Sequence, residues 1–262
     1  MLIKETLEAP ELNRSVNLHI HVPNGCDANN PCPVLYFHDG DCVFEENPSR
    51  GIGSLHYNEY YKDYSQFLPK VIIVGIEPPV GRWERTAELS PYTKSFETHG
   101  ADFEPTVHGK GKQLIKWIVN ELKPWIDARY PVLPDQRNTA IGGMSSGALN
   151  ATYAAMMYPD VFGRLLLHGP AYNLWLDKLL ETAENADFSN LHRCYMDIGT
   201  NDFTRMSEKE KTMFCALRMK EEMIKKGMTP NNLKFFTIPN GEHSAETWRW
   251  TFPDAIRWVF PM

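Results

Sequence analysis

The feature that most constrains the fold is a series of short apolar runs separated by longer segments with helical periodicity. The runs at 34–37 (VLYF) and 71–76 (VIIVGI) are continuously apolar, as strands buried on both faces of a sheet are. Similar runs predict further strands at 2–7, 16–22, 139–142, 164–168, 195–199 and 233–238. Strands that alternate with helices in this way indicate βαβ units and a mostly parallel sheet.

Helices are predicted at 114–126, at 146–158 and from Ser207 onward, and a last helix is expected after Pro253. The alternating pattern of 2–7 and 16–22 favours an antiparallel edge. We therefore expect one α/β domain over residues 1–262, with a central sheet of about eight strands and helices on both faces. Residues 78–112 show little periodicity, and we expect them to form a long loop over the active site.

Composition narrows the classes of partner. Hydrophobic residues make up 42% of the chain and charged residues 23%, which allows a sizeable core. The net charge of −6 argues against nucleic acid or an anionic membrane as partner. There is no signal-like apolar segment at the start and no run of eighteen apolar residues. Five cysteines without paired spacing are expected to be reduced thiols of a cytoplasmic protein.

The strongest local motif is GGMSSGA at 142–148, which contains G-x-S-x-G centred on Ser145. It follows a strand-like run and precedes a helix-like segment of small residues. A serine at such a tight turn projects its hydroxyl outward, and the helix N-terminus behind it favours developing negative charge. Ser146 is the rival nucleophile, but it lacks the glycine spacing. Its backbone N–H is better suited to an oxyanion hole.

A serine hydroxyl needs a base, and the base needs a carboxylate to orient it. His243 lies in the turn NGEH, directly after the strand predicted at 233–238, where the base of this fold is expected. His168 and His192 lie at strand ends and are expected to be structural. For the acid, Asp202 in the loop after 195–199 is favoured over Asp197, which lies within that strand.

An oxyanion hole needs two backbone donors. The Ser146 amide is one candidate. The turn HDGD, which follows the strand at 34–37, offers the second through the Asp41 amide, with Cys42 as the alternative. A plain strand-ending turn is the competing interpretation of HDGD.

Other residues are weaker candidates for substrate contact. Arg82, Trp83 and Arg85 lie in the segment expected to cover the site, and Trp248 lies close to His243 in sequence. The aromatic group around Trp248 is also typical of core packing. No metal site is predicted, because His19 and His21 lack a third ligand nearby; Cys26 and Cys32 are not predicted to pair or to bind metal.

The chain resembles the putative esterase family of α/β hydrolases, which includes enterochelin esterases, esterase D-like enzymes and feruloyl or acetyl-xylan esterases. The resemblance covers nearly the whole chain, through VLYFHDGD, VIIVGIEPP, RTAELSPY, the long stretch around GGMSSGA, DIGTND and NGEHSAETW. It implies Ser145 as nucleophile, Asp202 as acid and His243 as base. Ser146, Gly169 and Asp41 depart from residues common in the family, and the Asp41 carboxylate is expected to repel an anionic substrate without affecting catalysis.

These observations predict a serine hydrolase that cleaves carboxylic esters through an acyl-enzyme intermediate without metal or organic cofactor. The expected substrate is a small-molecule or carbohydrate-linked ester, and neither nucleic acid nor membrane is expected to bind. An acyltransferase or thioesterase with the same triad, or a non-catalytic binding module of the same fold, are the alternatives. The sequence leaves open which ester is cleaved and whether the chain forms a homo-oligomer.

Overall fold

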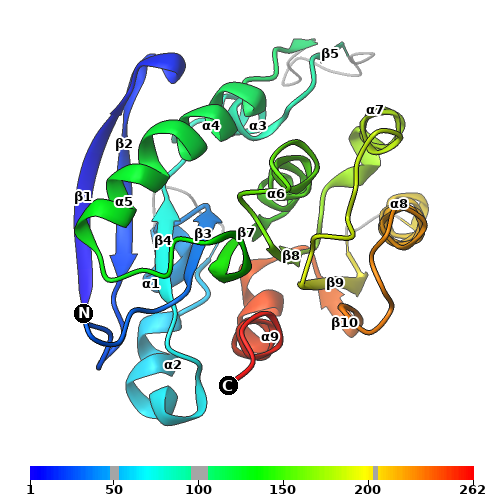
Figure 1. Ribbon diagram of the computed structural model, residues 1–262. Helices are drawn as coiled ribbons and strands as arrows, with labels where there is room; N and C mark the ends of the chain where they lie inside the picture. Colours follow the sequence, from blue (N-terminus) through cyan, green and yellow to red (C-terminus); the bar gives the residue numbers. More distant parts are fainter. Residues whose placement is uncertain (48–52, 96–105, 203–205) are drawn as a thin grey trace.

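The computed structural model describes residues 1–47, 53–95, 106–202 and 206–262. Its centre is an eight-stranded sheet in the order β1-β2-β4-β3-β7-β8-β9-β10 (Figure 1). A separate two-stranded ribbon pairs β5 (Lys94–Ser95) with β6 (Thr106–Val107). The strands of the main sheet are β1 Leu2–Ala9, β2 Arg14–His21, β3 Val34–His38, β4 Ile72–Ile76, β7 Thr139–Met144, β8 Arg164–His168, β9 Arg193–Asn201 and β10 Leu233–Glu242.

The direction of the strands explains where a ligand can bind. β2 pairs antiparallel with both β1 and β4, which confirms the antiparallel edge, and all other pairs in the sheet are parallel. From β3 the chain moves to β4 on one side, and it then returns to β7 on the other side and continues outward to β10. The strand order therefore reverses at β3 and β7. In open parallel sheets, ligands bind beyond the carboxyl ends of the strands at such a reversal.

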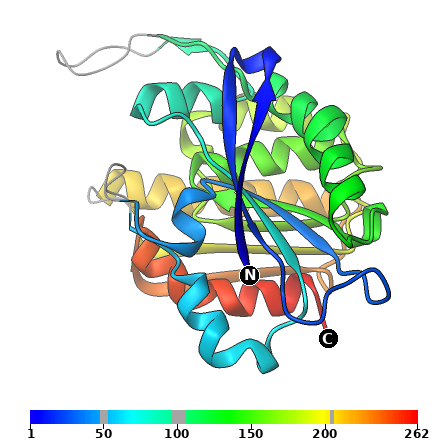
Figure 2. The same cartoon turned by 90° about the vertical axis from the view of Figure 1, so that its left-hand side faces the viewer.

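Helices cover both faces of the sheet, as the sequence predicts. In Figure 2 the green helices α4 to α6 lie on one side and the red α9 and cyan α2 on the other. Within the described residues, no helix is both long and apolar enough to cross a membrane. The helices are α1 Asp41–Phe44, α2 Tyr57–Tyr64, α3 Arg82–Leu89, α4 Gly111–Trp117, α5 Lys123–Arg129, α6 Ser146–Met157, α7 Leu176–Ala183, α8 Met206–Lys225 and α9 Ala245–Val259.

Alternate residues of each central strand enter two different cores. In β3, Val34 and Tyr36 pack in the cluster that includes α4, α6 and α8, whereas Leu35 and Phe37 pack in the cluster that includes α1, α2 and α9. All of these side chains are fully buried. This two-sided burial is the reason that the central strands are apolar at every position.

Both α5 and α9 contain a proline. Between α4 and α5 the chain makes a π-helical turn at Ile118–Leu122, directly before the segment that contains Pro124. Because proline has no N–H and its ring crowds the preceding turn, the wider π turn lets the helical path continue instead of ending it. In α9, Pro253 lies inside the helix, which begins at Ala245 and therefore much earlier than expected.

The segment 78–112 is not a continuous loop. Residues 82–89 form α3, and β5 and β6 follow it; residues 96–105 lie outside the described part of the chain. Helix α3 is anchored near its end by Glu88, a buried carboxylate that receives hydrogen bonds from Nε and Nη2 of Arg14 at 2.8 and 2.5 Å. A helix with only one buried turn has too weak an apolar pattern to be recognised from sequence.

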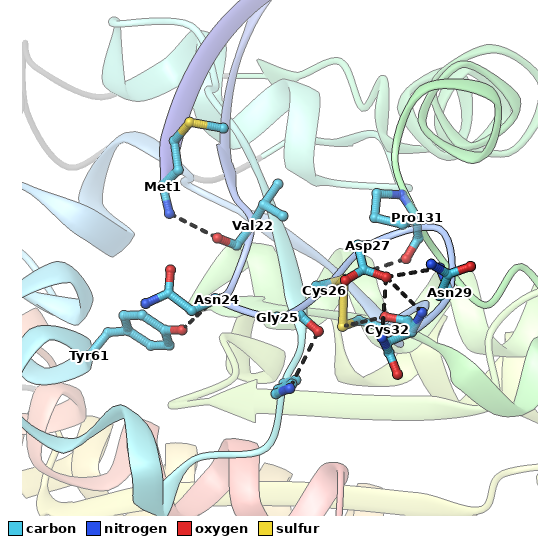
Figure 3. Close-up of a disulfide and its surroundings, with 12 residues drawn as sticks. Met1, Val22, Asn24, Gly25, Cys26, Asp27, Asn29, Cys32, Tyr61 and Pro131 are labelled. Carbon is cyan, nitrogen blue, oxygen red and sulfur yellow. Dashed lines mark hydrogen bonds between the residues drawn. A yellow bond between two sulfur atoms is a disulfide. The ribbon is translucent and has the colours of Figure 1, made fainter.

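Cys26 and Cys32 form a disulfide, with their Cα atoms 5.9 Å apart (Figure 3). The expectation that all five cysteines are reduced is therefore wrong for this pair, while Cys42, Cys194 and Cys215 are free and buried. The loop between the two cysteines folds back at Asp27, whose Oδ1 accepts hydrogen bonds from the backbone N–H groups of residues 29 and 30. This turn brings the two Cα atoms within disulfide range.

Candidate active site

Ser145 occupies a sharp turn between β7 and α6. Its φ of 56° and ψ of −118° place it outside the regions that most residues adopt, so the turn is strained and must be held by its surroundings. Its N–H donates to the His168 carbonyl at 2.9 Å, and its own carbonyl accepts from the Ala171 N–H at 3.1 Å. The turn is therefore tied to β8 and to the loop that follows β8.

The two glycines of G-x-S-x-G have a direct steric explanation. A Cβ added to Gly143 would lie 2.6 Å from the carbonyl carbon of Gly147, and one added to Gly147 would lie 2.9 Å from Cβ of His38. The strand before Ser145 and the helix after it thus approach each other as closely as backbones can. The turn that presents Ser145 therefore has no room for a side chain at either glycine of the motif.

His243 and Asp202 reach Ser145 from the ends of the next strands. Asp202 follows β9, and His243 lies between β10 and Ser244, the N-cap of α9. The two strand ends touch, because a Cβ on Gly199 would lie 2.2 Å from the Gly241 carbonyl oxygen. Asn240, in the part of β10 where the register with β9 shifts, adopts a positive φ of 56° and donates its N–H to Thr200 Oγ1 at 2.7 Å.

The three side chains form one chain of hydrogen bonds. His243 Nε2 lies 2.8 Å from Ser145 Oγ, and His243 Nδ1 lies 2.6 Å from Asp202 Oδ1. Asp202 is fully buried, whereas the His243 side chain keeps 19% of its surface exposed. A carboxylate at Asp202 accepts a hydrogen bond from Nδ1–H and so keeps the proton on Nδ1, which leaves Nε2 as an acceptor for the Ser145 hydroxyl. This arrangement can make Ser145 a nucleophile.

The competing acid and bases have other partners. Asp197 Oδ2 lies 2.7 Å from His168 Nδ1 and accepts a hydrogen bond from Thr251 Oγ1 at 2.7 Å. His192 Nε2 lies 3.1 Å from Gln136 Oε1. The structure thus joins Asp202, and not Asp197, to His243.

The two proposed oxyanion donors each begin a helix. Ser146 is the first residue of α6, and Asp41 is the first residue of α1. The Cys42 N–H donates to the Asp39 carbonyl at 3.0 Å, which disfavours Cys42 as the second donor. The turn before Asp41 lies directly on β4, because a Cβ on Gly40 would lie 2.1 Å from the carbonyl carbon of Gly75.

A cavity of about 290 Å³ opens beside Ser145 and His243. Three of the four residues predicted to contact substrate line it: Arg82, Arg85 and Trp248. Trp83 does not, and it lines a different cavity together with Leu12 and Arg14. The cavity is completed by Val80 and Met144, which the sequence reasoning missed. Met144 is the variable residue directly before the serine in G-x-S-x-G, and this position next to the nucleophile could have identified it as a residue of the cavity.

The cavity wall contains a buried ion pair. Arg85 donates from Nε and Nη2 to the two carboxylate oxygens of Asp39, at 2.5 and 2.6 Å, and the Asp39 side chain is fully buried. Burial by itself lowers the Arg85 pKa, but the charge and hydrogen bonds of Asp39 outweigh it, so the pKa is raised and the guanidinium stays charged. Arg82, on the same helix, has no ion-pair partner among the described residues.

Solved structures share this architecture. The enterobactin esterase FES from Shigella flexneri superposes with a TM-score of 0.72 at 17% identity, over 97% of this chain, and this chain spans 58% of that protein's length. An IroE-like serine hydrolase from Shewanella oneidensis superposes with a TM-score of 0.73 at 21% identity, over 98% of this chain and 79% of that one. At these identities the likeness shows the fold alone.

Similarity in sequence to known proteins also covers nearly the whole of this chain. The uncharacterized protein YbbA of Bacillus subtilis (strain 168) is 23% identical over 251 residues, which is 95% of this chain and 93% of that protein. The sequence model of the Putative esterase family matches residues 9–259. With almost the whole length matched, this chain belongs to the Putative esterase family.

Proposed function

We propose that this chain is a serine hydrolase that cleaves carboxylic esters through an acyl-enzyme intermediate. The single observation that supports this most is the hydrogen-bonded chain from Ser145 through His243 to Asp202, which opens onto a cavity. Membership of the Putative esterase family supports the same reaction class. No step of this route calls for a metal ion or an organic cofactor.

The first half of the reaction transfers the acyl group to Ser145. His243 Nε2 takes the hydroxyl proton as Ser145 Oγ attacks the ester carbonyl carbon, and the carbonyl oxygen becomes an oxyanion. The tetrahedral intermediate then collapses, the bond to the alkoxy oxygen breaks, and His243 gives its proton to the departing alcohol. Asp202 stabilises the imidazolium that exists between these two events.

The second half releases the acid. A water molecule replaces the alcohol, His243 takes its proton, and the hydroxide attacks the acyl carbon. The bond to Ser145 Oγ breaks, and the proton returns to that oxygen. In both halves the amides of Ser146 and Asp41 are the proposed oxyanion donors, and the positive end of the α6 dipole behind Ser146 adds to their effect.

The cavity suggests a compact substrate, either a small-molecule ester or an ester linked to carbohydrate. Val80, Met144 and Trp248 supply apolar wall, and Arg82 supplies a charge that no described carboxylate pairs with. A cavity of about 290 Å³ is at the lower end of the sizes that hold small ligands. A short acyl group bound against Trp248 fits this space.

A labelling and turnover experiment tests the proposal. A fluorophosphonate probe should modify Ser145, and Ser145→Ala should abolish both labelling and hydrolysis of p-nitrophenyl acetate. Ser189→Ala is a matched control, because Ser189 is exposed and follows α7 rather than β7. Undiminished ester hydrolysis by Ser145→Ala would refute the mechanism.

The same experiment separates the alternatives. A wild-type protein that neither reacts with the probe nor turns over esters would favour a non-catalytic binding module. Alcohols added during turnover identify an acyltransferase, because a transfer product then replaces the free acid. A panel of esters and thioesters graded by acyl length and aromatic character would then define the substrate class.

A further inference from the structure

The Asp39 side chain lies between the two segments that carry the proposed oxyanion donors. Asp39 belongs to the turn that leads into Asp41, and its Oδ2 would lie 3.3 Å from a Cβ on Gly147, which is in the first turn of α6 after Ser146. Asp39 itself has a positive φ of 59°, a left-handed conformation that aspartate adopts more readily than most residues other than glycine. A carboxylate at this point can influence both donors, provided that it is held in place.

The back of the turn is fixed by backbone contacts. The Gly40 N–H donates to the Ile76 carbonyl at 3.0 Å, and the Val43 N–H donates to the Gly40 carbonyl at 3.3 Å. These bonds position Gly40 against β4, but the peptide that carries the Asp41 N–H also depends on the conformation of Asp39. The Asp39 side chain is the part of the turn that faces α3.

Arg85 holds that side chain from α3. Two of its N–H groups bind both carboxylate oxygens of Asp39, which fixes the carboxylate in position and in rotation. A buried carboxylate without such a partner would favour other conformations, because an unpaired charge is costly inside a protein. The same Arg85 lines the cavity beside Ser145, so its role as a direct substrate contact and its role as a support can be separated by experiment.

We propose that Arg85 is a positioning residue, which acts through its bidentate pair with Asp39 to hold the turn that presents the Asp41 amide to the oxyanion. This inference rests on the proposed function. It differs from the sequence-based expectation that Arg85 contacts the substrate directly. The geometry favours a role in holding the turn at Asp39, because two of the guanidinium N–H groups already donate hydrogen bonds to Asp39.

The test compares the wild type with one variant that conserves the charge of Arg85 and with one double variant that removes both charges of the pair. Arg85→Lys keeps the charge but loses the two parallel hydrogen bonds, and the double variant Asp39→Asn with Arg85→Gln removes both charges so that no buried ion is left unpaired. Both should lower kcat for p-nitrophenyl acetate roughly 100-fold, as expected for a misplaced oxyanion donor, with KM nearly unchanged. Affinity for a trifluoromethyl ketone, whose adduct with Ser145 carries an oxyanion, should fall by a similar factor.

A matched control lies on the same helix. Arg14→Gln breaks the pair with Glu88, which lies three residues after Arg85 in α3 and accepts its hydrogen bonds from Arg14 rather than from the Arg85–Asp39 pair. This variant should lower thermal stability without the loss of ketone affinity. Circular dichroism on every variant establishes that each is folded before its kinetics are compared.

Two results would overturn the inference. One is wild-type kcat and ketone affinity in both Arg85 variants. The other is an increase in KM that is confined to an anionic ester such as p-nitrophenyl hemisuccinate, because that result identifies Arg85 as a substrate contact. Failure of the proposed function is separate, since it would appear as absence of probe labelling and turnover in the wild type.

Discussion

His168 and Asp197 form a histidine–aspartate pair like that of His243 and Asp202, with Nδ1 2.7 Å from Oδ2 and both side chains fully buried. The two residues lie opposite each other in the register of β8 and β9. The ring of Trp248 contacts the His168 ring at a centroid distance of 6.5 Å and the His243 ring at 5.0 Å. The His168 pair therefore resembles the His243 pair in composition but has different surroundings, and of these two pairs the His243 pair is the one that reaches Ser145.

The two pairs should respond differently to loss of the carboxylate charge. Asp202→Asn should lower kcat about 10⁴-fold, because the amide cannot hold the required tautomer of His243. Asp197→Asn should instead lower the free energy of unfolding by about 2 kcal/mol, because it weakens buried hydrogen bonds to His168 and Thr251. Ester turnover and urea denaturation measure the two effects. A large loss of turnover in Asp197→Asn with none in Asp202→Asn would show that the wrong acid was chosen.

Gly169 should be needed for the position of Trp248. It has a positive φ of 46°, and a Cβ at this position would lie 2.5 Å from Cζ2 of Trp248. Gly169→Ala should destabilise the fold by about 1–2 kcal/mol through backbone strain, and should also lower kcat because the displaced indole disturbs His243. Gly227→Ala is the control, since its φ is 110° and its added Cβ would meet Ser189 instead. Equal turnover in the two variants would contradict this prediction.

His21 should make the fold less stable in mild acid. Both ring nitrogens are buried without hydrogen-bond partners among the described residues, and the rings of Phe44, Tyr57 and Tyr61 surround the imidazole. Burial, with a smaller effect from the positive N-terminus, lowers its pKa to about 4. Burial lowers the pKa of His38 to about 4 as well, and the charge of Asp39 opposes that shift.

The sign of this effect follows from proton uptake. Above pH 6.5 the histidine is neutral in both states, whereas between pH 6.5 and about 4 the unfolded chain binds a proton that the folded chain does not. Each such histidine should therefore remove about 1.4 kcal/mol of stability per pH unit in that window. His21→Phe should reduce the slope of unfolding free energy against pH by that amount and leave the contribution of His38. An unchanged slope would show that His21 protonates freely in the folded protein.

The Cys26–Cys32 disulfide predicts how many cysteines an alkylating reagent modifies before and after reduction. Under denaturing, non-reducing conditions, iodoacetamide should modify the three free cysteines, Cys42, Cys194 and Cys215. After reduction it should modify Cys26 and Cys32 as well. Intact-mass spectrometry counts the added groups. Five additions before reduction would show that the pair is not formed.

Much of this protein is determined locally by its sequence. The apolar runs identify all eight strands of the main sheet, because burial on both faces demands apolar residues at successive positions. The order of Ser145, Asp202 and His243 after successive strands was enough to select them, since the carboxyl ends of neighbouring parallel strands lie together. Gly143 is part of a local signature as well, because a Cβ on it would meet Gly147 four residues later, whereas a Cβ on Gly147 would meet His38 of β3.

Other features depend on contacts between residues that are distant in sequence, and only the tertiary structure decided them. The pairing of Arg85 with Asp39 requires α3 to fold back over the end of β3, and neither residue type indicates the other. The Cys26–Cys32 disulfide depends on one turn, and the place of Trp248 beside His243 depends on where α9 begins. The hydrophobic pattern of each segment reflects how that segment is buried, so the pattern identified the strands. The positions of Ser145, Asp202 and His243 after those strands then identified the candidate triad. The residues that line the cavity, and the Arg85–Asp39 pair beside it, depend on which segments pack against each other. Only the tertiary structure determines that packing.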